Sequence, residues 1–173
     1  YMLREFTVEN KDITEAYLHI AADLVFIVHI NGEQAGANDG CIICEYDIKS
    51  YIKPGRNVIA VECRQLQLKK GFTAGIMIEY SDGSKDEILS DVTWRSSDKL
   101  TDGWTEPCFD FSDWQESPEL ADYGDEPWGR LQKKICTPEP APLMRKWFHL
   151  EKEVKSARAY ICGLGYYELF ING

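Results

Sequence analysis

One stretch of the chain places aromatic rings next to carboxylates. Trp104, Tyr123 and Trp128 lie between residues 93 and 130, and Asp122 and Asp125 lie close to the last two. A sugar presents apolar C–H faces and a rim of hydroxyls, so its binding sites pair an aromatic platform with carboxylate or amide acceptors. These five residues are therefore candidate carbohydrate contacts. The alternative is that each one packs the loop onto the folded body, because an aromatic ring buries a large area.

No pattern in the sequence assigns a catalytic residue. The 29 acidic residues make a carboxylate pair suited to glycoside hydrolysis easy to imagine, but nothing singles one pair out. Gly163-Leu164-Gly165 lacks the third glycine and the following helix of a dinucleotide loop. The GxSxG, P-loop and HExxH motifs do not occur. We therefore expect the chain itself to be non-catalytic.

The cysteines and histidines favour structural roles. Cysteines occur at positions 41, 44, 63, 108, 136 and 162, and Cys41-x-x-Cys44 has no second pair at zinc-site spacing. Strand residues three apart point to opposite faces, which suits neither chelation nor a redox pair. We expect buried thiols, while a disulfide and a metal site remain alternatives, and no cofactor is indicated. His19, His29 and His149 are expected on sheet faces.

The composition and charge of the chain exclude some classes of binding partner. The chain has 173 residues, a net charge of −10 and no cluster of Lys and Arg, so it is expected to repel nucleic acid. The longest apolar run, Leu24 to Ile30, is far shorter than the ~20 residues of a membrane span. No secretion leader is visible, so any such signal is expected to be absent or removed.

Short strands and tight turns dominate the first 90 residues. Val25 to Ile30 alternates, with Phe26, Val28 and Ile30 on one face, and Asn31-Gly32 suits the two positive φ angles of a hairpin turn. Residues 57–63 follow a Pro-Gly turn and are apolar on both faces, which predicts a central strand. Residues 75–80 and 85–89 flank another turn. We therefore expect an all-β antiparallel sandwich or jelly roll.

The chain also repeats itself. A shift of about 141 residues aligns Ile30-Asn31-Gly32 with Ile171-Asn172-Gly173 and brings further matches between the two segments. Residues 93–130 form a Trp-rich excursion, and residues 136–142 are a Pro-rich, extended linker. The predicted organisation is a jelly-roll sandwich over residues 1–135, the linker, and the first strands of a second, truncated sandwich over residues 143–173.

Two segments carry a resemblance to known proteins. The stretch APLMRKWFHLEKEVKSARAYICGLGYYELFING, through its residues 143–173, resembles the opening of the N-terminal β-sandwich of bacterial α-L-rhamnosidases, glycoside hydrolase family 78. The earlier stretches AYLHIAADLVFIVHING and YIKPGRNVIAVE are similar to the galactose-binding-like jelly rolls that accompany many glycoside hydrolases.

The resemblance implies an accessory role. Family 78 enzymes cleave terminal α-L-rhamnose with carboxylates of a helical barrel that follows the sandwiches, so no catalytic residue carries over to this chain. The chain is then a structural or carbohydrate-binding module whose partner is the catalytic domain of its parent enzyme. The alternative is a stand-alone carbohydrate-binding or protein-interaction sandwich of another glycoside hydrolase.

The resemblance also bears on cofactor and compartment. Some relatives bear a calcium-dependent rhamnose-binding sandwich, but no calcium motif is recognisable here. The implied parent is a secreted or periplasmic bacterial enzyme, with a cytoplasmic location left open, and neither nucleic acid nor a membrane is expected as a partner.

Overall fold

The chain divides into two units, Tyr1–Pro138 and Glu139–Gly173. The structure, a computed structural model, describes residues 1–23, 25–39, 41–64, 71–126, 129–135, 144–149, 151–161 and 169–172. The predicted linker 136–142 lies outside these residues. The described part of the second unit forms neither strand nor helix. A second sandwich over residues 143–173 therefore stays a prediction.

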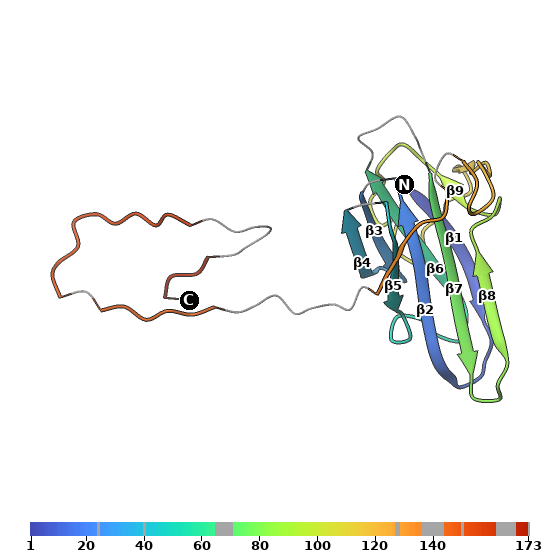
Figure 1. The fold of residues 1–173 in the computed structure, drawn as a ribbon, viewed down its shortest axis with the longest axis horizontal. Helices are drawn as coiled ribbons and strands as arrows, with labels where there is room; N and C mark the ends of the chain where they lie inside the picture. Colours follow the sequence, from blue (N-terminus) through green and yellow to red (C-terminus); the bar gives the residue numbers. More distant parts are fainter. Residues whose placement is uncertain are drawn as a thin grey trace. The chain divides into compact units, whose positions relative to one another are not determined.

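The first unit is a β-sandwich of two sheets, as the sequence predicts (Figure 1). The first sheet, in the order β10-β9-β1-β6-β3-β4, consists of β1 (Met2–Val8), β3 (Val25–Ile30), β4 (Glu33–Asp39), β6 (Gly55–Arg64), β9 (Arg95–Ser96) and β10 (Gln115–Glu116). The second sheet, in the order β11-β5-β2-β7-β8, consists of β2 (Ile13–Ala22), β5 (Ile43–Asp47), β7 (Phe72–Tyr80), β8 (Lys85–Leu89) and β11 (Lys133–Ile135).

One strand pair departs from the antiparallel pattern. β11 pairs in parallel with β5, whereas the other strand pairs are antiparallel. β11 returns after the Trp-rich excursion, and a strand that arrives by a long connection can join an edge in either direction. In the described part of the chain, no helix has the length and apolar character that crossing a membrane requires.

The predicted hairpin of β3 and β4 is confirmed. Asn31 has φ 53° and Gly32 has φ 89°, the two left-handed residues of a turn that matches strand twist. Phe26, Val28 and Ile30 are fully buried, while the alternate residues of β3 are half-buried. The positive φ favours glycine at position 32, and a Cβ there would also lie 2.9 Å from the carboxylate of Glu106, whose side chain would have to shift.

A buried asparagine fixes this turn against β6. Asn57 is fully buried, and its side-chain amide donates hydrogen bonds to the carbonyls of Lys53 (2.7 Å) and Gly55 (2.9 Å). Its Oδ1 accepts from the backbone N–H of Lys53 (3.0 Å) and from Nδ2 of Asn31 (2.8 Å). Asn31 Oδ1 in turn accepts from the N–H of Val58 at 3.0 Å. These bonds hold the hairpin turn and the start of β6 together.

The first sheet is covered on both faces. The main core lies between the sheets and includes Trp94. A second cluster on the outer face of the first sheet joins Leu3, Val58 and Ala60 to Trp104, which stacks on Trp114 with ring centroids 6.1 Å apart. The apolar residues on both faces of β6 are therefore explained by two layers of cover.

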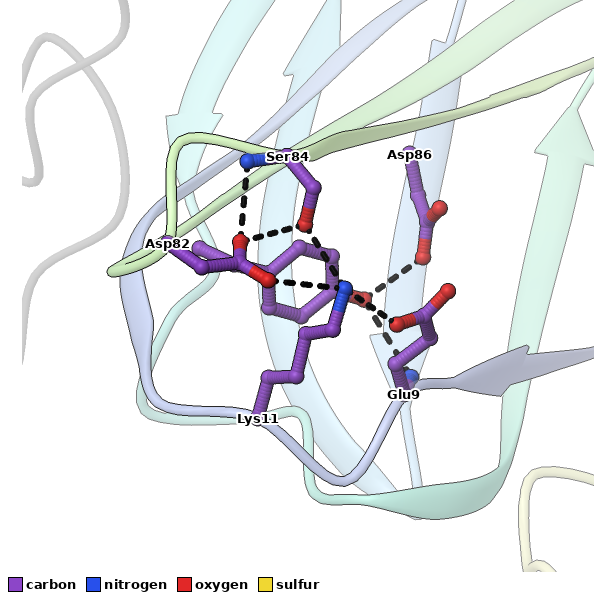
Figure 2. Close-up of polar contacts among 6 residues, drawn as sticks. Glu9, Lys11, Asp82, Ser84 and Asp86 are labelled. Carbon is purple, nitrogen blue, oxygen red and sulfur yellow. Dashed lines mark hydrogen bonds and ion pairs between the residues drawn. The ribbon is translucent and has the colours of Figure 1, made fainter.

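The opposite end of the sandwich from the N-terminus holds a polar cluster, which we call the Lys11 cluster (Figure 1, Figure 2). Lys11 Nζ contacts Glu9 Oε2 (2.7 Å), Asp82 Oδ2 (3.0 Å) and Ser84 Oγ (2.9 Å). Tyr80 donates its hydroxyl to Asp86 Oδ2 at 2.6 Å. The cluster ties the β1–β2 connection to the β7–β8 turn, and its groups bind one another (Figure 2).

Two expectations for reactive side chains need correction. Cys44 is buried and Cys63 is half-buried, but Cys41 and Cys108 are exposed because they lie in loops outside the strands. Cys136 and Cys162 lie outside the described residues. His19 and His29 lie on β2 and β3 as expected. His149 lies outside any strand that the structure describes.

Candidate functional site

A cavity of about 530 Å³ opens at the end of the sandwich where β2 and β6 end and β7 begins. Its volume falls within the ~300–1,000 Å³ of small-molecule sites. Apolar side chains supply much of the wall: Met2, Ala22, Val25, Phe72, Pro118, Leu120 and Leu131. Such a wall suits the apolar face of a small ligand.

Three residues of this wall each carry a polar atom that is buried without a partner among the described residues. The atoms are Asp23 Oδ2, Trp94 Nε1 and Ser117 Oγ. Trp94 is only 3% exposed and Ser117 only 8%. Leaving a buried donor or acceptor unpaired costs about 1–3 kcal/mol, so a water molecule or a polar ligand that reached these atoms would stabilise the wall.

Contacts with neighbouring segments place each of the three residues. The Trp94 ring packs edge-on against Phe72, with ring centroids 4.7 Å apart. The backbone N–H of Ser117 donates to the carbonyl of Trp94 at 3.0 Å. Asp23 directly follows β2, and its N–H donates to the carbonyl of Gly71 at 3.1 Å. Segments far apart in the sequence therefore bring an acceptor, a donor and a hydroxyl to one wall.

Three of the five predicted contacts line this cavity. Asp122, Tyr123 and Asp125 all belong to its wall, and Tyr123 is 61% exposed. The Tyr123 hydroxyl donates to the carbonyl of Leu131 at 3.5 Å, and the N–H of Asp125 donates to the carbonyl of Asp122 at 3.1 Å. A turn therefore presents one aromatic ring between two carboxylates.

A fourth predicted contact does not join it. Trp104 is only 7% exposed and does not line the cavity, because its ring packs on the outer face of the first sheet between Tyr1 and Trp114. Trp104 therefore holds the loop on the sandwich and offers no face to a sugar. Trp128 lies outside the described residues.

Sequence reasoning missed Asp23, Trp94 and Ser117 as site residues. Trp94 belongs to the Trp-rich excursion, and it packs in the main core. A weak signal existed for Asp23, since a carboxylate directly after a strand of apolar residues lies at the end of a sheet. Nothing local distinguished Ser117, whose role depends on distant neighbours.

The electrostatics of the wall favour reversible binding. Burial raises the pKa of the Cys63 thiol, which lines the cavity, to about 11, so this thiol stays protonated and unreactive. Among the described residues, no group of three His, Cys, Asp or Glu side chains is placed to hold a metal ion. What the wall offers is hydrogen-bond donors and acceptors set in an apolar surface.

Comparison with known proteins places this fold among carbohydrate-active proteins. No family model matches the chain. An alpha-L-rhamnosidase of Streptomyces avermitilis is 33% identical over 172 residues, covering 94% of this chain and 16% of the relative. The chain thus spans about one sixth of that protein's length.

Solved structures agree on the sandwich. The crystal structure of the Streptomyces avermitilis alpha-L-rhamnosidase complexed with L-rhamnose has a TM-score of 0.71 and 29% identity, over 76% of this chain and 14% of that one. The lectin from Pleurotus ostreatus in complex with GalNAc has a TM-score of 0.68 and 26% identity, over 74% of this chain and 38% of that one.

Proposed function

We propose that this chain, which is homologous to a segment of alpha-L-rhamnosidases, is a non-catalytic carbohydrate-binding β-sandwich of a larger glycoside hydrolase. The larger enzyme would release terminal α-L-rhamnose from glycans, an activity suggested by the name of its relatives. The similarity to a GalNAc-binding lectin supports sugar recognition by this fold.

The observation that carries the proposal is the set of three unpartnered atoms in the cavity wall. A sugar hydroxyl can donate to Asp23 Oδ2, accept from Trp94 Nε1–H and do either with Ser117 Oγ. The apolar wall around Phe72 and Leu120 would cover the C–H face of the same sugar.

Residues at the turn would complete the site. Tyr123 offers an exposed aromatic ring, and the carboxylates of Asp122 and Asp125 can accept hydrogen bonds from the outer hydroxyls. In this proposal the buried atoms orient the sugar, and the turn adds further contacts with it. Because few groups make the contact, we expect affinity in the millimolar to micromolar range.

Titration calorimetry tests the proposal. The chain is titrated with L-rhamnose, methyl α-L-rhamnoside, galactose and GalNAc, each with and without calcium. The proposal predicts saturable binding of at least one of these sugars. The calcium arms test whether the wall carboxylates recruit a metal when sugar is present. Flat titrations with every sugar in both conditions would contradict the proposal.

A structural role is the second candidate, and the placement of two tryptophans favours it. Trp94 and Trp104 pack inside the unit and do not form an exposed coplanar platform. Such a module would support the catalytic domain without touching substrate. Deletion of the module from the full-length enzyme would then lower its melting temperature and activity on small substrates alike. A deletion that changed neither the melting temperature nor the activity would rule out this role.

A further inference from the structure

Charge is distributed unevenly around the cavity. Its described lining carries five carboxylates, and two of them, Asp23 and Asp91, lie on the sandwich body. The other three, Glu119, Asp122 and Asp125, lie exposed on the segment that closes one side. Arg64 is the one basic side chain in this described lining.

The one basic side chain of the described lining is paired in part. The Arg64 guanidinium pairs with Glu62, Nε to Oε1, at 2.7 Å. The main-chain nitrogen of Tyr1, which also lines the cavity, donates to the carbonyl of Ser97 at 2.9 Å. Glu62 therefore offsets the charge of Arg64, although the two Nη groups of Arg64 take no part in that contact and can still donate to a ligand.

The negative groups are compensated only in part. Asp91 Oδ2 pairs with Nη2 of Arg4 at 3.2 Å and Oδ1 accepts hydrogen bonds from Thr93. Burial by itself raises the pKa of Asp91, but the Thr93 hydrogen bonds and the Arg4 charge hold it below its ordinary value overall, so Asp91 stays ionised. Asp23, Glu119, Asp122 and Asp125 have no ion-pair partner within the described ranges.

We propose that the cavity selects its sugar by charge, admitting neutral and amino sugars and rejecting uronic acids and sulfated or phosphorylated sugars. This inference rests on the proposed sugar-binding function and narrows the class of ligand. The carboxylates are part of a binding wall because the unpartnered atoms of Trp94 and Ser117, both more than nine-tenths buried, lie in the same wall.

The physical basis is repulsion across a partly closed space. Hydroxyl and ammonium groups donate to carboxylates, whereas a ligand carboxylate can only accept and brings a like charge close to several others. The low-dielectric wall weakens screening relative to bulk water. An anionic sugar would therefore lose both hydrogen bonds and electrostatic energy that its neutral counterpart keeps.

The test compares sugars that differ in one substituent. Methyl glycosides of the D-galacto, D-gluco, D-manno and L-manno configurations are each measured as the neutral sugar, the 2-amino sugar and the 6-carboxylate, and the L-manno series has the configuration of L-rhamnose. We expect the uronate to bind at least about tenfold more weakly than its neutral counterpart at low salt. The amino sugar should bind as tightly as the neutral sugar or more tightly. Raising the ionic strength from about 10 mM to about 1 M should shrink both differences.

A charge-neutralised variant ties the selectivity to this wall. Glu119→Gln with Asp125→Asn should raise the affinity for the uronate relative to the neutral sugar. Glu15→Gln is the matched control, because Glu15 is exposed near the start of β2, whereas the cavity lies where β2 ends, so the ratio should not change.

The outcomes separate the two proposals. Equal binding of neutral sugar and uronate overturns charge selection and leaves sugar binding intact. An unchanged ratio in the Glu119→Gln, Asp125→Asn variant also overturns it. If no sugar of any configuration binds, the proposed function fails, and the charge selection that depends on it fails as well.

Discussion

At the scale of single residues, Ser117 gives the clearest distinction between binding and packing. Its hydroxyl oxygen is buried without a partner among the described residues, so it contributes no internal hydrogen bond to the fold. Removing such a group is neutral or stabilising for folding, whereas a ligand that used the group loses one hydrogen bond. Binding and stability should therefore change in opposite directions.

Ser117→Ala is expected to weaken sugar binding by about twofold to tenfold and to leave the melting temperature unchanged or higher. Ser84→Ala is the matched control, because Ser84 Oγ bonds to Lys11 (2.9 Å) and Asp82 (2.6 Å) at the other end of the sandwich. That control should lower stability and leave binding unchanged. Calorimetric titration and thermal unfolding of both variants measure the two effects. A loss of stability in Ser117→Ala with full binding would assign Ser117 to packing.

Protonation of His29 is expected to lower the stability of the folded chain in acid. Its Nδ1 is buried without a partner among the described residues, and its ring meets Trp104 edge-on with centroids 6.3 Å apart. Burial lowers the pKa of His29 in the folded state, although Glu62 opposes this. The unfolded chain therefore binds the proton more readily, and stability is full above about pH 6.5 and declines as the pH falls towards the folded pKa.

His29→Phe removes this titration and keeps an aromatic ring against Trp104. The free energy of unfolding of the parent chain should fall from pH 7.5 to pH 5 more steeply than that of the variant. Urea unfolding at several pH values within this window measures the difference, and carboxylates contribute equally to both proteins. Identical slopes would show that His29 does not sense acid.

At the scale of elements, the Asn57 contacts decide whether the β3–β4 turn and the start of β6 hold together. Truncation of Asn57 removes the acceptor of the Lys53 N–H and the donor to the carbonyls of Lys53 and Gly55. It also leaves the Asn31 amide with the carbonyl of Tyr51 as its remaining acceptor. Asn57→Ala should therefore cost about 2–4 kcal/mol of unfolding free energy. Chemical denaturation measures it, with Asn10→Ala as an exposed control. A cost below that of the control would contradict the assigned role.

The Lys11 cluster should stabilise the other end of the sandwich over a definite pH range. Hydrogen bonds to Glu9 and Asp82 raise the pKa of Lys11, and bonds from Ser84 and then Lys11 lower that of Asp82. Lys11 contributes fully to stability as long as the pH stays below its pKa in the unfolded chain. Asp82 contributes fully as long as the pH stays above its pKa in the unfolded chain. The contribution is thus full between about pH 4 and about pH 10.

Lys11→Met should lower the melting temperature at pH 7 in low salt, and the gap from the parent chain should narrow in about 1 M salt because the cluster is exposed. Scanning calorimetry at two salt concentrations measures the gap. A gap that does not respond to salt would mean that Lys11 acts through packing on the ring of Tyr80, which lies 5.4 Å from its Nζ.

The elements show why some of this fold could be predicted and some could not. Alternation and turn residues predict the β3–β4 and β7–β8 hairpins, because those signals are local. The order of strands in the sheets and the parallel pairing of β11 depend on distant contacts that no short window contains. Apolar residues on both faces of β6 predicted a central strand, and the same pattern could have indicated that Trp104 packs over its outer face.

The residues of the candidate site also divide into those with a local sequence signal and those that only distant contacts bring together. Asp122, Tyr123 and Asp125 were predicted because their chemistry lies together on one turn. Asp23, Trp94 and Ser117 come from three separate segments, and their shared property, a buried polar atom without a partner, exists only once the sandwich has closed. Residue type alone also could not separate Trp104, which packs inside, from a ring that faces a ligand.

At the scale of the whole molecule, residues 1–135 form the sheets, both apolar clusters and the cavity. A fragment ending at residue 135 should therefore fold alone and keep the melting temperature and sugar affinity of the 173-residue chain. Circular dichroism, thermal unfolding and calorimetric titration of the fragment measure this. A fragment that is unfolded, or folded without binding, would show that residues 136–173 contribute to the first unit.

The central claim is that the cavity wall around Trp94 receives a sugar, and the indole N–H of Trp94 reports on it directly. A ¹⁵N–¹H spectrum of the chain shows one indole signal for each of its five tryptophans, and Trp94→Phe identifies the Trp94 signal by its loss. Addition of the sugar that binds in calorimetry should shift the Trp94 signal most and leave that of Trp104 nearly unchanged. A Trp94 signal that stays in place while sugar saturates the protein would contradict the account.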